Sequence, residues 1–287
     1  MAPGQVEKVL DFVKMNPSGN ITLIVTSHLS RKLHVKAGLL LIGTDYLSAE
    51  QVGFLEKPAD SRASGRLQMM GGEFCGNASR AMAALLMDKT SERVEKLQEG
   101  QEMQVLTLEV SGCENLVPVA VTPLNDRKWW TEMQVPSPRS VEKVEVLIEE
   151  RTLEAFRVSW PGIEHLVLEN INPAEEIYKS LLDQKCFKPG SEARGVMFYN
   201  PATSVLIPLV AVGDNPPIWE GSCGSGSTAV AVCQAFCHGS SINNLVLKQP
   251  KGEITVDVEY LKDKVNRLVI KGTVEKIAEG QVFLPDL

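Results

Sequence analysis

The fold is decided by residues 73–87, EFCGNASRAMAALLM, because residues 221–236, GSCGSGSTAVAVCQAF, repeat their pattern. Each stretch places a Cys before a Gly, then small polar residues, and then a run rich in Ala and other apolar residues. The two cysteines, Cys75 and Cys223, lie about half a chain apart. Self-similarity at this spacing indicates two halves of related design rather than a tandem array.

The segments around the two Cys-Gly stretches support the same division. Residues 81–87 and 229–236 are apolar almost all round, which is typical of helices buried on every face. Strand-like runs surround them, with the clearest period-two alternation in residues 254–259. The other such runs are residues 21–25, 38–42, 105–110, 116–121, 205–212 and 267–270, together with the segment near Leu245. We therefore expect an α/β (α+β) fold with two pseudo-symmetric barrel-like halves, each around a central buried helix.

The boundaries of the two halves follow from less regular segments. Residues 88–102 read as a charged linker within the first half, and residues 124–128 as the boundary between the halves.

The overall composition excludes several classes of function. A net charge of −7, without any run of Lys or Arg, argues against a nucleic-acid surface. The first residues lack the basic head and apolar run of a signal peptide, and no segment is apolar enough to span a membrane. We expect a cytoplasmic protein that has a small-molecule substrate and neither nucleic-acid nor membrane partners.

Six cysteines are too few for a disulfide framework at this length, so we expect free thiols. Cys233, Cys237 and His238 match no common zinc spacing, and the two cysteines fall in an apolar helix where Cys packs as a small hydrophobe. We expect no metal site. Cys113 and Cys186 have no supporting context.

Each Cys-Gly pair stands where a helix begins, and backbone N–H groups at that end have no partner within the helix. The helix dipole favours negative charge there by about 0.3–1 kcal/mol, and by up to about 2 kcal/mol when partly buried. This predicts a lowered thiol pKa and some thiolate near neutral pH. Gly76 and Gly224 let backbone amides approach an anion closely.

Two such thiols match what stereoinversion requires. One group removes the α-proton from one face of a carbon, while another delivers a proton to the opposite face. Amides at the helix starts stabilise the charge that builds on a substrate carboxylate. A single Cys-Gly at a helix start usually carries no function, so the pairing of Cys75 with Cys223 is the informative feature.

Several further motifs occur in an order that resembles a known family. They are residues 14–20 (KMNPSGN), 52–54 (VGF), 75–77 (CGN), 162–165 (GIEH) and 223–226 (CGSG), followed by a closing strand at 269–284. This pattern resembles the diaminopimelate epimerase-like superfamily of cofactor-independent, two-thiol racemases and epimerases. The resemblance implies a homodimer, no cofactor, and an active site in the cleft between the two barrels. It also implies a discontinuous first domain, 1–124 plus 274–287, around a second domain, 125–273.

The resemblance also assigns roles to residues. Cys75 and Cys223 would be the catalytic pair, and Asn20 would contact the substrate. The α-carboxylate would be held by backbone amides of four residues: Gly76, Asn77, Gly224 and Ser225. Glu56 occupies the position of a substrate-binding Gln, while His165 and Glu220 would tune the ionisation of the thiols.

Departures from the epimerase pattern argue against diaminopimelate as the substrate. The Asn and Arg that would hold the far, charged end of that molecule are replaced in residues 162–165 and 219–222, and unpaired polar groups are costly. The sequence is more similar to the histidine racemases of staphylopine-type metallophore pathways, for example in residues 50–54 and 72–78. An imidazole needs acceptors, which Glu50 or Glu56 would supply; the alternative for each is a solvated residue at a strand end.

Histidine racemisation is therefore the leading hypothesis. The alternatives are an epimerase or racemase of another amino acid and a catalytically silent amino-acid-binding homologue. Retention of both cysteines argues against the silent homologue, because a carboxylate cradle needs the amides rather than the thiols.

Overall fold

The computed structural model describes residues 8–91 and 103–285. The chain divides into two compact units, Met1–Met133 with Lys271–Leu287, and Gln134–Ile270. The first unit continues beyond residue 124 because residues 124–128, expected to be a boundary, form the turn of a hairpin. The chain returns to the first unit at Lys271, near the expected position of 274.

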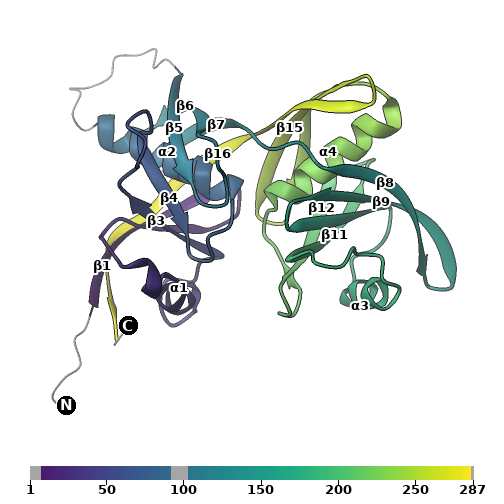
Figure 1. Cartoon of the computed structure of the whole chain (residues 1–287), viewed down its shortest axis with the longest axis horizontal. Coiled ribbons are helices and arrows are strands. Elements are labelled where there is room, and N and C mark those ends of the chain that lie inside the picture. The colour runs from purple at the N-terminus through teal and green to yellow at the C-terminus, as the bar shows by residue number, and fades with distance from the viewer. Residues whose placement is uncertain (1–7, 92–102, 286–287) are drawn as a thin grey trace. The chain divides into compact units, whose positions relative to one another are not determined.

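The first unit is a barrel. In the described part of the chain its eight strands are neighbours in the order β1-β2-β3-β4-β5-β6-β7-β16, and β1 also pairs with β16, which closes the circle (Figure 1). The strands are β1 (Lys8–Pro17), β2 (Thr22–Val25), β3 (Gln51–Glu56), β4 (Gly65–Met69), β5 (Gln104–Val110), β6 (Val117–Asn125), β7 (Lys128–Gln134) and β16 (Lys264–Leu284). Its helices are η1 (Arg31–Leu33), α1 (His34–Ile42) and α2 (Gly76–Ser91).

The second unit has a similar strand order, with β16 and β8 at its two ends. Its strands follow one another in the order β16-β15-β14-β12-β11-β10-β9-β8, with the short β13 beside β12. They are β8 (Ser140–Ile148), β9 (Arg151–Trp160), β10 (Ile163–Glu169), β11 (Ala193–Asn200), β12 (Val205–Val212), β13 (Ile218–Trp219), β14 (Ile242–Gln249) and β15 (Gly252–Leu261). Its helices are α3 (Glu175–Asp183) and α4 (Gly224–His238).

The parallel strand pairs show the internal duplication. Parallel neighbours need a crossover connection, which is usually a helix. In the first unit α1 connects the parallel pair β2–β3, and α2 connects β4–β5. In the second unit α3 connects β10–β11, and α4 connects β12–β14. The two pseudo-symmetric halves expected from the sequence are confirmed.

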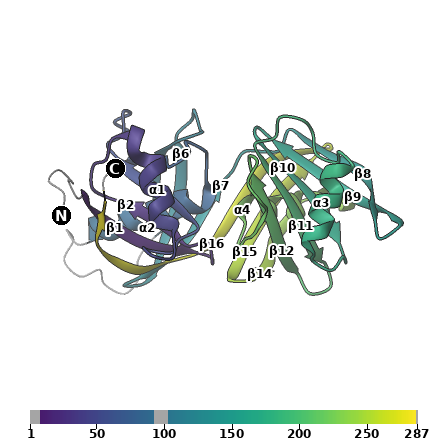
Figure 2. The ribbon, with the colours of Figure 1, turned by 90° about the horizontal axis from the view of Figure 1, so that it is seen from below.

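The two helices that follow the Cys-Gly pairs are the central ones. Ala81–Leu85 of α2 and Ala229–Cys233 of α4 are almost completely buried. Figure 2 shows α3 and α4 on opposite faces of β11, so the second unit has one helix inside the strands and one outside.

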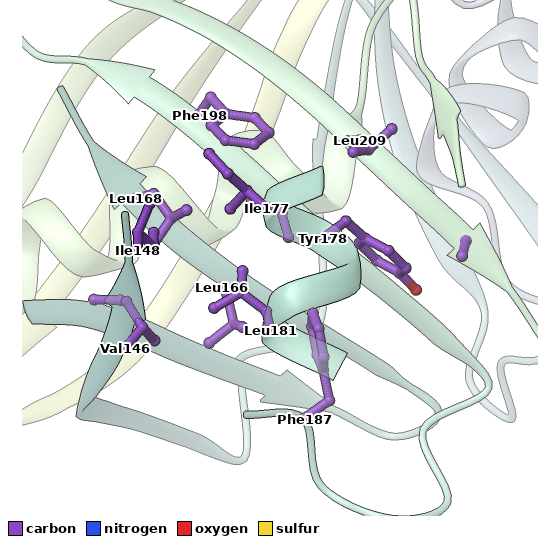
Figure 3. Close-up of a cluster of buried hydrophobic side chains, with 13 residues drawn as sticks. Val146, Ile148, Leu166, Leu168, Ile177, Tyr178, Leu181, Phe187, Phe198 and Leu209 are labelled. Atoms are coloured by element: carbon purple, nitrogen blue, oxygen red, sulfur yellow. The ribbon is translucent and has the colours of Figure 1, made fainter. Parts of the chain in front are cut away.

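The outer helices cover the opposite side of the strands through their own apolar clusters. Tyr178 and Leu181 of α3 pack with Leu166, Phe198 and their neighbours (Figure 3). In the first unit, Ala37 and Leu41 of α1 pack with Val52 and Phe54 of β3 in the same manner.

One expected strand is wrong: residues 38–42 belong to helix α1. The buried positions of this helix are His34, Ala37, Gly38 and Leu41, which is the i, i+3, i+4, i+7 spacing of one helical face. The short apolar run GLLLI is ambiguous by itself, and the helical period becomes visible only when the four preceding residues are included. The other strand-like runs are confirmed as parts of β2, β5, β6, β12, β14, β15 and β16.

Candidate active site

Cys75 lies immediately before helix α2, and its sulfur contacts the first turn. The Ala78 N–H donates a hydrogen bond to Cys75 Sγ at 3.4 Å. The carbonyl of Cys75 accepts from both the N–H and the hydroxyl of Ser79, at 3.0 and 2.8 Å. These bonds place the sulfur at the N-terminal end of a buried helix, as the sequence predicts.

A chain of side-chain hydrogen bonds connects this thiol to β2 and β3. Cys75 Sγ donates to Gln51 Oε1 at 3.0 Å, and Gln51 Nε2 donates to Asn20 Oδ1 at 2.6 Å and to Thr22 Oγ1 at 2.7 Å. Asn20 Nδ2 donates in turn to Glu50 Oε2 at 2.8 Å. The structure thus brings the expected residues Asn20 and Glu50 to Cys75, through Gln51, which sequence reasoning did not single out.

Cys223 is the N-cap of α4 and repeats the geometry of Cys75. Its Sγ accepts from the Gly226 N–H at 3.3 Å, and its carbonyl accepts from the N–H and hydroxyl of Ser227 at 3.0 and 2.7 Å. The N–H of Cys223 donates to Gln249 Oε1 at 2.7 Å. Each thiol therefore receives the amide three residues later, while a serine four residues later holds the carbonyl.

The side chains near Cys223 are different from those near Cys75. Ser225 Oγ lies 3.5 Å from Cys223 Sγ and 2.8 Å from His165 Nε2. The Glu220 carboxylate is both a like charge and a hydrogen-bonding partner for the ionisable thiol. Both of the residues expected to tune the thiols, His165 and Glu220, are therefore placed around this one thiol.

Burial is the main cause of the shifted pKa values of Cys75, Cys223 and His165. It raises the pKa of Cys75 to about 11, and together with the Glu220 carboxylate it raises the pKa of Cys223 well above the ordinary value. Burial also lowers the pKa of His165 to about 4, so this imidazole is neutral at neutral pH. The expected thiolate near neutral pH is thus wrong for the free protein: the helix amides favour it, but the loss of water outweighs them.

Glu56 is not brought to Cys75. It lies at the far end of β3 from Gln51, and its carboxylate accepts from Arg31 Nε and Nη2 at 2.9 and 2.5 Å. Since alternate residues of a strand face opposite sides, Glu56 shares the face of Val52 and Phe54, which pack with α1. Glu56 therefore agrees better with the alternative to a substrate-binding role, a residue at the end of a strand. Its side chain is partly exposed.

The four residues expected to form the carboxylate cradle stand at the helix starts. Gly76 and Gly224 are the first residues of α2 and α4, followed by Asn77 and Ser225. Asn77 is buried, and its side-chain oxygen accepts from Arg80 Nη2 at 2.8 Å. Arg80 is a second residue that sequence reasoning missed, because a charged residue in an apolar helix shows its surroundings only after folding.

The remaining thiols lie outside this arrangement. All six cysteines are free, and Cys233 is buried within α4, where it packs as expected. Cys237 is exposed, so the packing role expected for it is wrong.

Among the described residues, no three His, Cys, Asp or Glu side chains are grouped as a metal site would require. In the same part of the chain, every helix is too short or too polar to span a membrane.

Comparison with known proteins places the chain in a family. The family model described as the histidine racemase CntK N-terminal domain matches residues 9–283. The chain belongs to the histidine racemase family. A histidine racemase of Fusobacterium nucleatum subsp. nucleatum is 32% identical over 96% of this chain and 97% of its own length. One of Staphylococcus aureus is 25% identical over 96% and 98%. As a member of this family, the chain is an isomerase that racemises an amino acid.

Solved structures show the same fold at low identity. A probable proline racemase from Agrobacterium radiobacter superposes with a TM-score of 0.67 at 14% identity, over 95% of this chain and 92% of its own. A hydroxyproline epimerase from Agrobacterium vitis has a TM-score of 0.67 at 15% identity, over 97% and 93%. These similarities support the two-barrel, pseudo-symmetric fold.

Proposed function

We propose that this chain interconverts L- and D-histidine without a cofactor, with Cys75 and Cys223 as the two acid–base groups. The observation that carries the proposal is the repeated geometry of the two thiols: each receives an amide N–H from the first turn of its own buried helix. Family membership supports histidine as the amino acid.

The reaction needs one thiolate and one thiol on opposite faces of the substrate Cα. The thiolate takes the α-proton, and the electron pair of the C–H bond passes into the carboxylate. The other thiol then delivers its proton to the opposite face, so the configuration inverts. One cysteine gains a proton and the other loses one, and no oxidant or reductant is consumed. The reverse reaction starts from the exchanged protonation states.

The raised pKa values of the two thiols are compatible with this chemistry when substrate binds. A free amino acid carries an ammonium group next to the carbon that reacts, and a nearby positive charge favours the thiolate. The free protein therefore holds both thiols protonated, and ionisation is coupled to the arrival of substrate.

The helix starts supply the remaining contacts. Backbone N–H groups of Gly76 and Asn77, and of Gly224 and Ser225, would hold the α-carboxylate and the charge that develops on it. Glu50, joined to Cys75 through Asn20 and Gln51, would accept the imidazole N–H. Glu56 would take no part in binding the substrate, since its carboxylate pairs with Arg31.

Incubation of the pure protein with L-histidine in D2O tests the proposal. The expected result is loss of optical rotation, with D-histidine that carries deuterium at Cα, because the proton delivered comes from a thiol equilibrated with solvent. Absence of both racemisation and deuterium exchange rules out histidine. A panel of other free amino acids then separates a racemase of different specificity from a silent binding homologue, which would turn over none of them.

A further inference from the structure

Gln249, the last residue of β14, lies against the helix start that carries Cys223. Its side chain is buried, and the tight turn that follows it leads into β15. The same turn also holds Gly221, whose carbonyl accepts from the Lys251 N–H at 2.9 Å. The turn between β14 and β15 is thus joined to the Cys223 segment at two points.

Three hydrogen bonds form a closed ring around the backbone of Cys223. The Cys223 N–H donates to Gln249 Oε1 at 2.7 Å, and Gln249 Nε2 donates to Ser227 Oγ at 3.0 Å. The Ser227 hydroxyl in turn donates to the Cys223 carbonyl at 2.7 Å. Both backbone groups of Cys223 are therefore held, one directly by Gln249 and one through Ser227.

The ring permits only one orientation of the Gln249 amide. A backbone N–H can only donate, so the end of the side chain that faces Cys223 is the carbonyl oxygen. The Ser227 hydroxyl proton is already donated to the Cys223 carbonyl, so the end that faces Ser227 is the NH2 group. All three residues are buried, and loss of one would leave polar groups of the others without a partner, which is costly away from water.

The counterpart in the first unit holds its helix start in a different way. β5 ends with the apolar Val110, where β14 ends with Gln249. In the turn after β5, the Ser111 hydroxyl donates at 2.8 Å to the carbonyl of Glu73, two residues before Cys75. The turn of the first unit thus holds the chain before its cysteine, whereas the turn of the second unit holds the cysteine itself.

We propose that Gln249 is a positioning residue, which locks the backbone of Cys223 and so holds its sulfur where it exchanges a proton with the substrate Cα. This inference rests on the proposed function, in which Cys223 is one of the two acid–base groups. Proton transfer needs that group within hydrogen-bond reach of the carbon, so a small displacement of the sulfur slows the reaction.

The ring also determines which amides of this helix start are occupied. The N–H groups of Cys223, Gly226 and Ser227 donate to Gln249 Oε1, to the Cys223 sulfur and to the Cys223 carbonyl. The two N–H groups between them belong to Gly224 and Ser225, the pair proposed to hold the α-carboxylate.

The test compares Gln249→Met, which keeps the length of the side chain but has no amide, with Gln234→Met as a matched control. Gln234 lies further along α4 and donates to Glu169 Oε1 of β10 at 2.7 Å, so its replacement also removes a glutamine hydrogen bond between α4 and a strand. Alkylation of Cys223 and Cys75 is followed at pH 9 by peptide mass spectrometry, without substrate. In Q249M, Cys223 should react about tenfold faster, because a buried sulfur whose backbone is no longer held is exposed to water more often. Cys75 should keep its rate, and Q234M should change neither thiol.

Turnover of L- and D-histidine in D2O separates positioning from a general loss of stability. In Q249M, inversion should fall about 10²-fold. From the enantiomer whose α-proton Cys75 removes, deuterium exchange with retention should persist, because Cys75 can still return a deuteron to the same face. The ratio of exchange to inversion therefore rises for one enantiomer, whereas loss of folded protein lowers both rates equally. An unchanged ratio would contradict the positioning role.

Ser227→Ala opens the ring at a second point and should also raise the alkylation rate of Cys223. The double variant Q249M/S227A should react little faster than the faster single variant, because the two residues act in one ring. Unchanged alkylation of Cys223 in folded Q249M, an equal rise of both thiols, or fully multiplicative effects in the double variant would overturn the proposal. If Q249M does not fold, S227A decides by the same measurement. Alkylation uses no amino acid, so a wild-type protein that fails to racemise histidine would refute the proposed function alone.

Discussion

The two helix entrances share a backbone arrangement and differ in the side chains around it. In both, an amide three residues after the Cys donates to the sulfur, and a serine four residues after it holds the Cys carbonyl. The duplicated strand order positions the two entrances in the same way within each unit. Duplication therefore accounts for the presence of two thiols at helix starts.

The differences lie in charge. Cys75 contacts the neutral amide of Gln51, has the Glu73 carboxylate nearby and has the buried cation Arg80 on its helix. Cys223 lies beside the Glu220 carboxylate and a Ser225–His165 pair. The same backbone geometry thus surrounds two thiols with different charged and polar neighbours, which would suit the proposed mechanism, in which one thiol is the base and the other the acid.

Replacing either thiol gives the largest expected effect. Cys75→Ser and Cys223→Ser should each lower racemisation by about 10²–10⁴-fold, because a hydroxyl is a far poorer base and acid at neutral pH. Chiral chromatography of histidine gives the racemisation rate, and α-deuterium incorporation in D2O detects exchange on one face only.

Matched controls for this pair are Cys113→Ser in the first unit and Cys186→Ser in the second. Both residues are half-buried free thiols in connecting segments outside α2 and α4, so activity should remain near wild type. Normal turnover in C75S or C223S would remove that thiol from the mechanism.

The buried His165, near Cys223, should lower the free energy of unfolding of the protein in acid. Burial holds its pKa at about 4, below the ordinary 6.5, so between these pH values the unfolded chain binds a proton that the folded chain does not. The stabilisation is present above pH 6.5 and disappears as the pH falls toward 4, by roughly 3 kcal/mol in total.

Urea unfolding at pH 7 and pH 4.5 measures this loss, and His165→Gln should reduce it. His34, a buried histidine in the first unit whose pKa is also lowered, contributes in the same direction and serves as the comparison through His34→Gln. An H165Q protein with the full wild-type pH dependence would contradict the assignment to His165.

Gly226 and Ala78 occupy the same position after their cysteines but have different space around them. A Cβ at Gly226 would lie 2.2 Å from Met197 Sδ and 3.2 Å from Cys223 Sγ. Gly226→Ala should therefore lower the free energy of unfolding by about 1–3 kcal/mol, as overpacking does. Chemical denaturation measures the change.

The double variant Gly226→Ala with Met197→Ala identifies the cause. Removing the long side chain of Met197 takes away the clash, so the cost of adding the methyl group should be smaller in the M197A background than in wild type. An equal cost in both backgrounds would show that Met197 is not the obstacle.

The smallest expected effect concerns Glu220. Glu220→Gln removes the negative charge that raises the pKa of Cys223, so this thiol should alkylate faster at pH 9, by up to about tenfold. Cys75 in the same protein is the internal control and should keep its rate. Unchanged alkylation of Cys223 would mean that burial alone sets its pKa.

Much of the fold was predictable because it follows from local patterns. Period-two alternation in residues 254–259 predicted β15, and all-round apolar character predicted the central helices. The run at residues 38–42 was misjudged as a strand, since five apolar residues carry too little periodicity to separate a strand from a helix. Helix α3 was not predicted, although Ile177, Tyr178 and Leu181 have helical spacing.

The site was predictable in part, for a similar reason. Cys-Gly followed by a small, apolar helix is a local signal, and it correctly predicted that both thiols stand at the start of a buried helix. Gln51 and Arg80 depend on contacts between segments far apart in the chain, and a Gln on a strand or an Arg in a helix has no local pattern that reveals such contacts.

The sequence alone determined the duplicated plan, the two thiols and the family. Only the tertiary structure decided which side chains surround each thiol, that Glu56 belongs to an ion pair on the other face of β3, and that burial outweighs the helix amides in setting the pKa of the thiols. The physical reason is that ionisation depends on the distance to water and to other charges, and both are established only when distant segments pack together.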